Sequence, residues 1–177
     1  RDMKWISLGG GIHFTGEGYP LQKLADRLKR FSDENQVQVY LEPGEAAITK
    51  SATLEVSVLD TLHNGKNLAI VDSSIEAHML DLLIYRQSAK VSPDAGAHEW
   101  MVCGKSCLAG DIFGEFRFDR ELKTGDRLSF IDAAGYTMVK KNWFNGVKMP
   151  SIAVRQLNGE VELVREFGYN DFESGLS

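Results

Sequence analysis

Two stretches near the start of the chain carry residues suited to holding an anion and a protonated ring. Gly9-Gly10-Gly11 follows a short apolar run at 4–8. Glycines after a strand let backbone N–H groups converge on a phosphate, because no Cβ blocks the approach; a tight turn is the alternative. Glu42, in Glu42-Pro43-Gly44-Glu45, ends the next apolar run. A carboxylate beside a phosphate pocket suits a ligand that also carries a protonated ring nitrogen, and a solvated turn is again the alternative.

The two cysteines, Cys103 and Cys107, bracket the sequence Gly-Lys-Ser. A thiol in a flexible, glycine-flanked loop is suited to donating a proton. A zinc site would need further ligands from the four histidines, which lack the usual paired spacing, so no metal is expected. Inert packing is the alternative for Cys103, which falls in a strand pattern. Tyr136 is a further candidate, because its hydroxyl can bind a phosphate, with aromatic packing as the alternative.

The elements that must position the first two motifs form a strand–helix–strand pattern. Apolar runs at 4–8 and 37–41 predict strands, and apolar residues at helical spacing from Leu21 to Phe31, after Pro20, predict a helix between them. Such a unit pairs its strands in parallel. Because parallel strands share a carboxyl edge, we expect the glycines and Glu42 to open on the same edge.

The chain after about residue 48 is expected to form a mostly antiparallel β-domain. Asn64-Gly65 and Asn158-Gly159 predict hairpin turns. Residues 75–85 are left open between helix and irregular structure, and residues 169–177 are expected to be a loose tail. The predicted strands cover 53–62, 67–72, 99–103, 112–118, 127–132, 136–140, 151–156 and 161–165. The fold class is therefore α/β over residues 1–47 followed by β over residues 48–177.

The amino-acid composition excludes some classes of binding partner. The chain has 177 residues, 43% of them hydrophobic and 25% charged, as in ordinary globular proteins. Its net charge of −5 argues against a nucleic-acid reader, and no apolar run approaches the ~20 residues of a membrane span. Two cysteines are too few for a scaffold held together by disulfides, so we expect a reducing, cytoplasmic setting. The chain begins with Arg1 rather than Met and is expected to be a piece of a longer protein.

In order and spacing, these motifs resemble the barrel-type, alanine racemase-like (fold-type III) pyridoxal-phosphate decarboxylases, which include ornithine and diaminopimelate decarboxylases. The motifs are GGG, EPG, C-G-x-x-C with Asp111 four residues on, G-Y-T, and F-N-G. The resemblance covers nearly the whole chain but only the second half of a family member. It implies the C-terminal end of a (β/α)8 barrel that binds pyridoxal phosphate, at 1–47, and a C-terminal β-domain at 48–177 whose loops reach the active site.

Longer stretches are similar to one branch of this family, which decarboxylates carboxynorspermidine or carboxyspermidine to norspermidine or spermidine in polyamine synthesis. They are LGGGIHFTGEGYP, YLEPGEA, CGKSCLAGDIFGEF and KNWFNG. The ornithine and diaminopimelate enzymes usually carry Arg where this chain has Glu45, and an acid where it has Leu108. Both departures favour a longer, polyamine-like substrate.

The resemblance also implies roles for single residues. Cys107 returns a proton to the substrate carbon after carbon dioxide leaves, and its loop reaches a neighbouring subunit's site, which implies a homodimer with shared active sites. Cofactor binding is implied for Gly9, Gly10, Gly11, Glu42 and Tyr136, of which Glu42 faces the ring nitrogen and the others face the phosphate. Substrate binding is implied for Glu45, Asp72 and Asp111.

The family's Schiff-base lysine lies in the first half of the barrel, and no lysine here matches its motif. The isolated chain is therefore expected neither to close the barrel nor to decarboxylate. Three alternatives remain: a diaminopimelate or other basic amino-acid decarboxylase of the same fold, a non-catalytic relative that binds partners, and a plain β-domain without a ligand.

Overall fold

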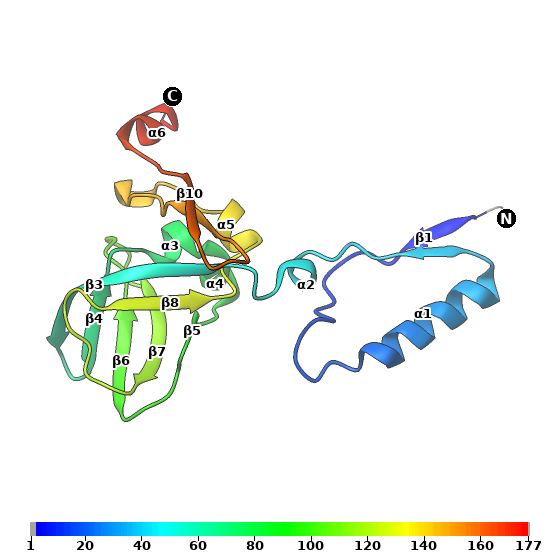
Figure 1. Ribbon diagram of the computed structural model, residues 1–177, viewed down its shortest axis with the longest axis horizontal. Coiled ribbons are helices and arrows are strands. Elements are labelled where there is room, and N and C mark those ends of the chain that lie inside the picture. Colours follow the sequence, from blue (N-terminus) through cyan, green and yellow to red (C-terminus); the bar gives the residue numbers. More distant parts are fainter. Residues whose placement is uncertain (1–2, 177) are drawn as a thin grey trace. The chain divides into compact units, whose positions relative to one another are not determined.

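The computed structural model describes residues 3–176. The chain divides into two compact units, one ending at Ser51 and the other beginning at Ala52. Each unit is a separate body with its own elements (Figure 1).

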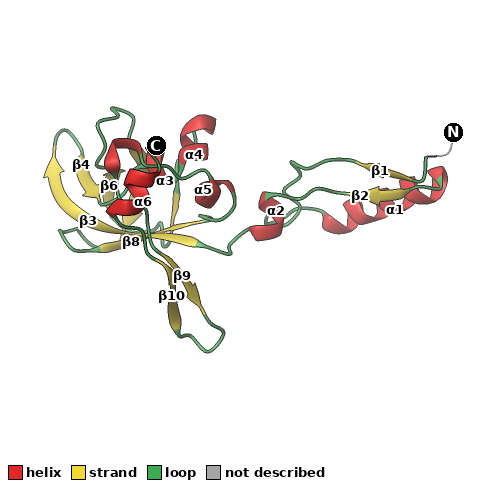
Figure 2. Cartoon of the chain, turned by 90° about the horizontal axis from the view of Figure 1, so that it is seen from above, coloured by secondary structure: helices red, strands yellow, loops and turns green. Residues whose placement is uncertain are grey.

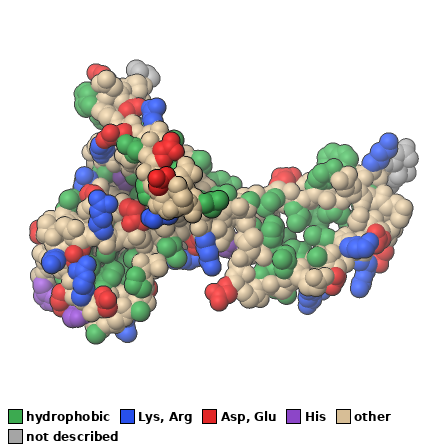
Figure 3. Space-filling model, in the orientation of Figure 1, with side chains coloured by type: hydrophobic (Ala, Val, Ile, Leu, Met, Phe, Trp, Pro, Cys, Tyr) green, Lys and Arg blue, Asp and Glu red, His purple; other side chains and the backbone are tan. Residues whose placement is uncertain are grey.

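The first unit is the expected strand–helix–strand arrangement. It contains β1 (Trp5–Ser7), α1 (Leu21–Asn35), β2 (Gln38–Tyr40) and the short α2 (Glu45–Ile48). β1 and β2 pair in parallel, with Ile6 opposite Val39, so the predicted parallel pairing is confirmed. Few of its residues are buried: Trp5 is 61% and Leu21 55% exposed, and Figure 3 shows apolar side chains on the surface of this unit. Two strands and one helix cannot cover an apolar core without further layers.

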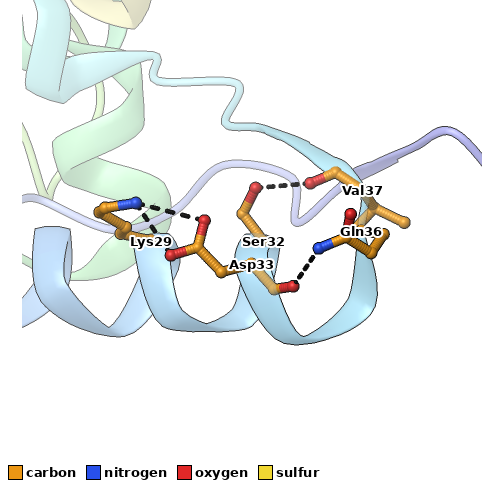
Figure 4. A network of polar contacts seen from close by, with 5 residues as sticks. All are labelled: Lys29, Ser32, Asp33, Gln36 and Val37. Atoms are coloured by element: carbon orange, nitrogen blue, oxygen red, sulfur yellow. Dashed lines mark hydrogen bonds and ion pairs between the residues drawn. The ribbon is translucent and has the colours of Figure 1, made fainter.

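The end of α1 is fixed by side chains that bind the backbone where the chain turns back toward β2 (Figure 4). Gln36 adopts a left-handed conformation, φ +52°, which stops the helix. The Ser32 hydroxyl donates to the carbonyl of Val37 at 2.6 Å, and the Gln36 amide donates to the carbonyl of Asp33 at 2.6 Å. Lys29 and Asp33 form an i,i+4 ion pair at 2.8 Å. These contacts determine where β2 begins and therefore where Glu42 lies.

The second unit is built on a six-stranded sheet with the order β5-β8-β3-β4-β6-β7. Its strands are β3 (Thr53–His63), β4 (Asn67–Val71), β5 (Lys90–Val91), β6 (His98–Cys103), β7 (Ile112–Phe118) and β8 (Arg127–Ile131). All neighbours are antiparallel except β4 and β6, which are parallel. Just before β5, the Ala89 amide donates to the carbonyl of Phe113 in β7 at 2.7 Å. The two edge strands therefore meet, and the sheet curls toward a barrel.

The core of this unit lies inside the curled sheet. Phe113 and Phe130 are fully buried and stack with ring centroids 4.6 Å apart, and Phe116 lies against Phe130 at 6.0 Å. The inward positions of β3, Leu54, Val56 and Val58, alternate with more exposed residues, as a half-buried strand requires. The mostly antiparallel sheet domain is thus confirmed.

Short helices cover one end of the sheet. Residues 75–85, left open by the sequence, form α3 (Ile75–His78) and α4 (Leu80–Tyr85). The predicted strand at 136–140 is wrong: this segment is α5 (Tyr136–Val139). Gly135 has φ +56°, which ends the extended chain, and the Thr137 amide then turns back to the carbonyl of Ala134.

The last part of the chain forms a hairpin and a helix. β9 (Ile152–Arg155) and β10 (Val161–Arg165) pair across the predicted Asn158-Gly159 turn, and Figure 2 shows the hairpin projecting from the six-stranded sheet. The expected loose tail is instead α6 (Tyr169–Ser174), whose start is capped by a bond from the Gly168 amide to Asp171 at 2.7 Å. Ser177 lies outside the described residues. No helix within residues 3–176 combines the length and apolarity needed to cross a membrane.

Candidate active-site residues

The carboxyl ends of β1 and β2 bring the glycine segment and Glu42 together, as the parallel pairing predicts. The pairing continues past both strands, since the Leu8 amide donates to the Tyr40 carbonyl at 3.0 Å and the Glu42 amide donates to the Gly9 carbonyl at 2.9 Å. The Ser7 hydroxyl donates to the Glu42 carboxylate at 2.5 Å and accepts from the Gly9 amide at 3.1 Å. Ser7, a residue that no sequence motif singles out, therefore orients the carboxylate against the glycines.

The backbone conformation at positions 9–11 requires glycine, and the same three glycines are suited to binding a ligand. Gly9 and Gly11 have φ of +71° and +84°, where a side chain would be strained, and a Cβ on Gly10 would overlap the carbonyl oxygen of Glu42. A Cβ on Gly9 or Gly11 would meet open space. Among residues 3–176, the Gly10 and Gly11 amides make no hydrogen bond. These residues fit a phosphate on the glycine segment and a ring nitrogen at Glu42.

The segment after the glycines is attached to α2. The His13 ring bonds the Thr49 hydroxyl at 2.8 Å, and the Thr15 hydroxyl donates to the carbonyl of Ala46 at 2.8 Å. Glu45 begins α2 and is half-buried. The glycine segment, Glu42 and Glu45 are thus parts of one interconnected structure within the first unit.

In the second unit, Asp111 anchors the loop that carries Cys107. It is 4% exposed. One carboxylate oxygen accepts the Ile75 amide of α3 at 2.7 Å, and the other accepts the Ser106 amide at 2.9 Å and the Ser106 hydroxyl at 2.5 Å. A Cβ on Gly104 would overlap this carboxylate. Burial and three protein donors suit Asp111 to anchoring this loop, and its expected contact with substrate stays a prediction.

Cys107 is exposed, and its amide donates to the Asn145 side-chain oxygen at 2.7 Å. Asn145 lies in a 3-10 turn, η1 (Phe144–Gly146), and has φ +55°. The C-G-x-x-C and F-N-G motifs, 38 residues apart, are thus joined by one hydrogen bond. Burial, and secondarily Asp111, raise the pKa of the Cys103 thiol. Of the two thiols, Cys107 is the more exposed, since Cys103 is partly buried.

Asp72 and Tyr136 are both exposed, as a ligand contact requires. Asp72 follows β4, and its carboxylate accepts the Ser57 amide at 2.8 Å. Tyr136 begins α5 and is 52% exposed, and the Lys140 ammonium lies 4.5 Å from its ring centroid. Within the described residues, no three His, Cys, Asp or Glu side chains are grouped so as to hold a metal ion.

A buried histidine that the sequence did not single out lies beneath the cysteine loop. His78, on α3, is 4% exposed, and its ring bonds the Ser73 hydroxyl at 2.8 Å. The Ser73 carbonyl in turn accepts the Lys105 amide of the loop at 3.0 Å. Burial above all, and then the charge of Lys105, lower the pKa of His78 to about 4, so its ring is neutral near pH 7. No helical pattern in 75–85 was strong enough to place this side chain inward.

Comparisons with known proteins agree with this architecture. A family model described as "pyridoxal-dependent decarboxylase, C-terminal sheet domain" matches residues 27–134. A carboxynorspermidine/carboxyspermidine decarboxylase of Herminiimonas arsenicoxydans is 59% identical over 99% of this chain and 48% of its own length. A carboxyaminopropylagmatine decarboxylase of Synechocystis is 37% identical over 98% of this chain and 46% of its own.

A solved structure supports the same relationship. The crystal structure of carboxynorspermidine decarboxylase from Campylobacter jejuni, complexed with norspermidine, matches with a TM-score of 0.89 at 39% identity, over 98% of this chain and 51% of that one. The chain therefore spans about half the length of these relatives. By the family match over residues 27–134, the chain belongs to the pyridoxal-dependent decarboxylases and carries their C-terminal sheet domain.

Proposed function

We propose that this chain is the C-terminal half of a pyridoxal-phosphate-dependent decarboxylase that converts carboxynorspermidine or carboxyspermidine to norspermidine or spermidine. The observation that carries the proposal is the joining of the glycine segment to Glu42 at one strand edge, through the 2.9 Å bond between the Glu42 amide and the Gly9 carbonyl. The 59% identity to a relative of that name favours this substrate class over other amines.

When bound, pyridoxal phosphate supplies an electron sink for the pair left by the departing carboxylate. The role of the first unit is to bind that group and to keep its ring nitrogen protonated. The Gly10 and Gly11 amides bind the phosphate oxygens, which need donors that approach closely. Glu42, held in place by Ser7, stabilises the proton on the ring nitrogen by charge attraction. Tyr136, which belongs to the second unit, is proposed as a further phosphate ligand through its hydroxyl.

The other proposed roles belong to the substrate side. Cys107 delivers a proton to the substrate carbon that has lost carbon dioxide. Asp72 and Glu45 bind ammonium groups of the polyamine, and a well-formed charge-assisted contact of this kind contributes about 1.5–3 kcal/mol. We further propose a cytoplasmic homodimer in which the cysteine loop serves the neighbouring subunit.

The substrate is tested with a panel given to the full-length protein reconstituted with pyridoxal phosphate. The panel contains carboxynorspermidine, carboxyspermidine, carboxyaminopropylagmatine, diaminopimelate and ornithine, and released carbon dioxide and amine product are measured. Carboxyaminopropylagmatine is included because of the 37% identical relative. We expect the highest kcat/KM with one of the first two compounds, and no turnover by residues 1–177 alone. A higher kcat/KM with diaminopimelate or ornithine, or turnover by the isolated chain, would contradict the proposal.

A further inference from the structure

The backbone of Cys107 is held by a side chain whose own conformation is restricted. Asn145 accepts the Cys107 amide at 2.7 Å and lies in the left-handed region, with φ +55° and ψ 17°. Asn and Gly are the residues that most readily adopt this conformation. The following residue, Gly146, also has positive φ, +64°. The turn therefore fixes the backbone from which the Asn145 side chain projects.

Asn145 is in turn fixed to α3 through Asn142. The Asn142 amide donates to the Ala77 carbonyl at 2.8 Å, and its side-chain NH₂ donates to the Glu76 carbonyl at 3.1 Å. The Asn142 side-chain oxygen accepts the Phe144 amide at 2.7 Å, which begins the turn that contains Asn145. Hydrogen bonds from α3 thus reach Phe144, and the next residue in the chain, Asn145, bonds Cys107.

The cysteine loop is attached to the same helix from its other side. Asp111 bonds both Ser106 and the Ile75 amide at the start of α3. Cys107 is adjacent to Ser106, so its backbone is fixed on one side by Asp111 and on the other by Asn145. With the backbone fixed, the thiol direction depends only on rotation about the Cα–Cβ bond.

We propose that Asn145 is a positioning residue, which fixes the Cys107 backbone and thereby directs the thiol toward the carbon it protonates. This inference rests on the proposed function, because it takes Cys107 as the proton donor. Positioning matters here because a displacement of about 1 Å can reduce a rate by about a hundredfold. Asn145 acts through Cys107.

The first test measures the geometry without any reaction. In the full-length protein, Asn145→Gly keeps the left-handed backbone but removes the acceptor, whereas Asn145→Asp keeps an acceptor oxygen. Hydrogen exchange at the Cys107 amide is followed by mass spectrometry on overlapping fragments. We expect exchange about fivefold to tenfold faster in Asn145→Gly and close to the original rate in Asn145→Asp, as the loss or retention of one hydrogen bond requires. Equal exchange in the two variants would overturn the inference.

The second test asks whether Asn145 acts through the thiol. kcat is measured for Asn145→Gly, Cys107→Ala and the double variant, all reconstituted with pyridoxal phosphate. We expect Asn145→Gly to lower kcat by at least about fivefold when Cys107 is present, with a smaller loss in Asn145→Asp, and to have no further effect in the Cys107→Ala background. A general destabilisation would lower kcat in both backgrounds by the same factor, and that result would overturn the inference.

These measurements distinguish failure of the proposed function from failure of the inference about Asn145. If Cys107→Ala leaves kcat unchanged, the proton-donor role of Cys107 fails and the positioning role of Asn145 fails with it, whatever the exchange result. If Cys107→Ala lowers kcat and Asn145→Gly does not, the proposed function stands and only the inference about Asn145 is overturned.

Discussion

Replacing Asp111 should destabilise the second unit far more than its place in a surface loop suggests. Asp111→Ala removes an acceptor for three donors: the Ile75 amide, the Ser106 amide and the Ser106 hydroxyl. Each bond to a charged group contributes about 1.5–3 kcal/mol net, and the stranded Ile75 amide adds a desolvation cost. Because these terms overlap, they are not simply summed, and we expect a total loss of about 3–5 kcal/mol in the free energy of unfolding, as for loss of a buried hydrogen-bond network.

Graded variants make this expectation specific. Asp111→Asn keeps the oxygen that faces Ile75 but loses an acceptor for the Ser106 amide, so a loss of about 1.5–3 kcal/mol is expected. Ser106→Ala removes only the hydroxyl bond and should cost about 1 kcal/mol. The exposed Asp119→Asn controls for the change of charge.

The assay is urea unfolding of the protein followed by tryptophan fluorescence, with the dependence on urea checked for each variant. The reasoning is refuted if Asp111→Ala loses less than about 1 kcal/mol, or no more than Ser106→Ala. A raised KM with unchanged stability would instead support the predicted substrate contact of Asp111.

Three further predictions concern His78, Gly10 and Asp72. Between about pH 6.5 and pH 4 the unfolded histidine binds a proton that native His78 does not, so the free energy of unfolding decreases by up to about 3 kcal/mol as the pH is lowered. Urea unfolding should show a smaller decrease in His78→Asn and an unchanged decrease in the exposed His63→Asn. Gly10→Ala, whose Cβ would overlap Glu42, should weaken pyridoxal phosphate binding at least about tenfold by absorbance titration of the full-length protein, and Gly65→Ala should not. Asp72→Asn keeps an acceptor for the Ser57 amide but loses the charge, so it should raise the polyamine KM about tenfold or more; an unchanged KM would exclude this contact.

The parts that could be predicted from the sequence depend on strong, regular patterns. Helical spacing between Leu21 and Phe31 and two short apolar runs were sufficient to predict a parallel pair, and parallel pairing alone places Gly9–Gly11 beside Glu42. The Asn-Gly turns at 64–65 and 158–159 predicted both hairpins correctly, because few residues other than Asn and Gly adopt the required dihedral angles.

The parts that could not be predicted depend on single contacts between distant residues. Tyr-Thr-Met-Val at 136–139 has strand composition, but the positive φ of Gly135 makes it helical. The burial of Asp111 depends on α3, which lies 36 residues earlier in the chain, and no local pattern shows such a partner. Asn145 lies within the F-N-G motif, but nothing in that motif shows that it binds the Cys107 amide, 38 residues away.

The four residues of α3 link the proposed amine contact to the loop that carries Cys107. Asp72, proposed to recognise the amine, lies three residues before the helix, and both attachments of the Cys107 loop end on the helix itself. A substitution in 72–78 that widens the range of accepted amines should therefore also disturb proton delivery, and kcat and KM should change together. Directed evolution toward a new amine should then recover turnover through second changes at 142–145, outside the segment under selection.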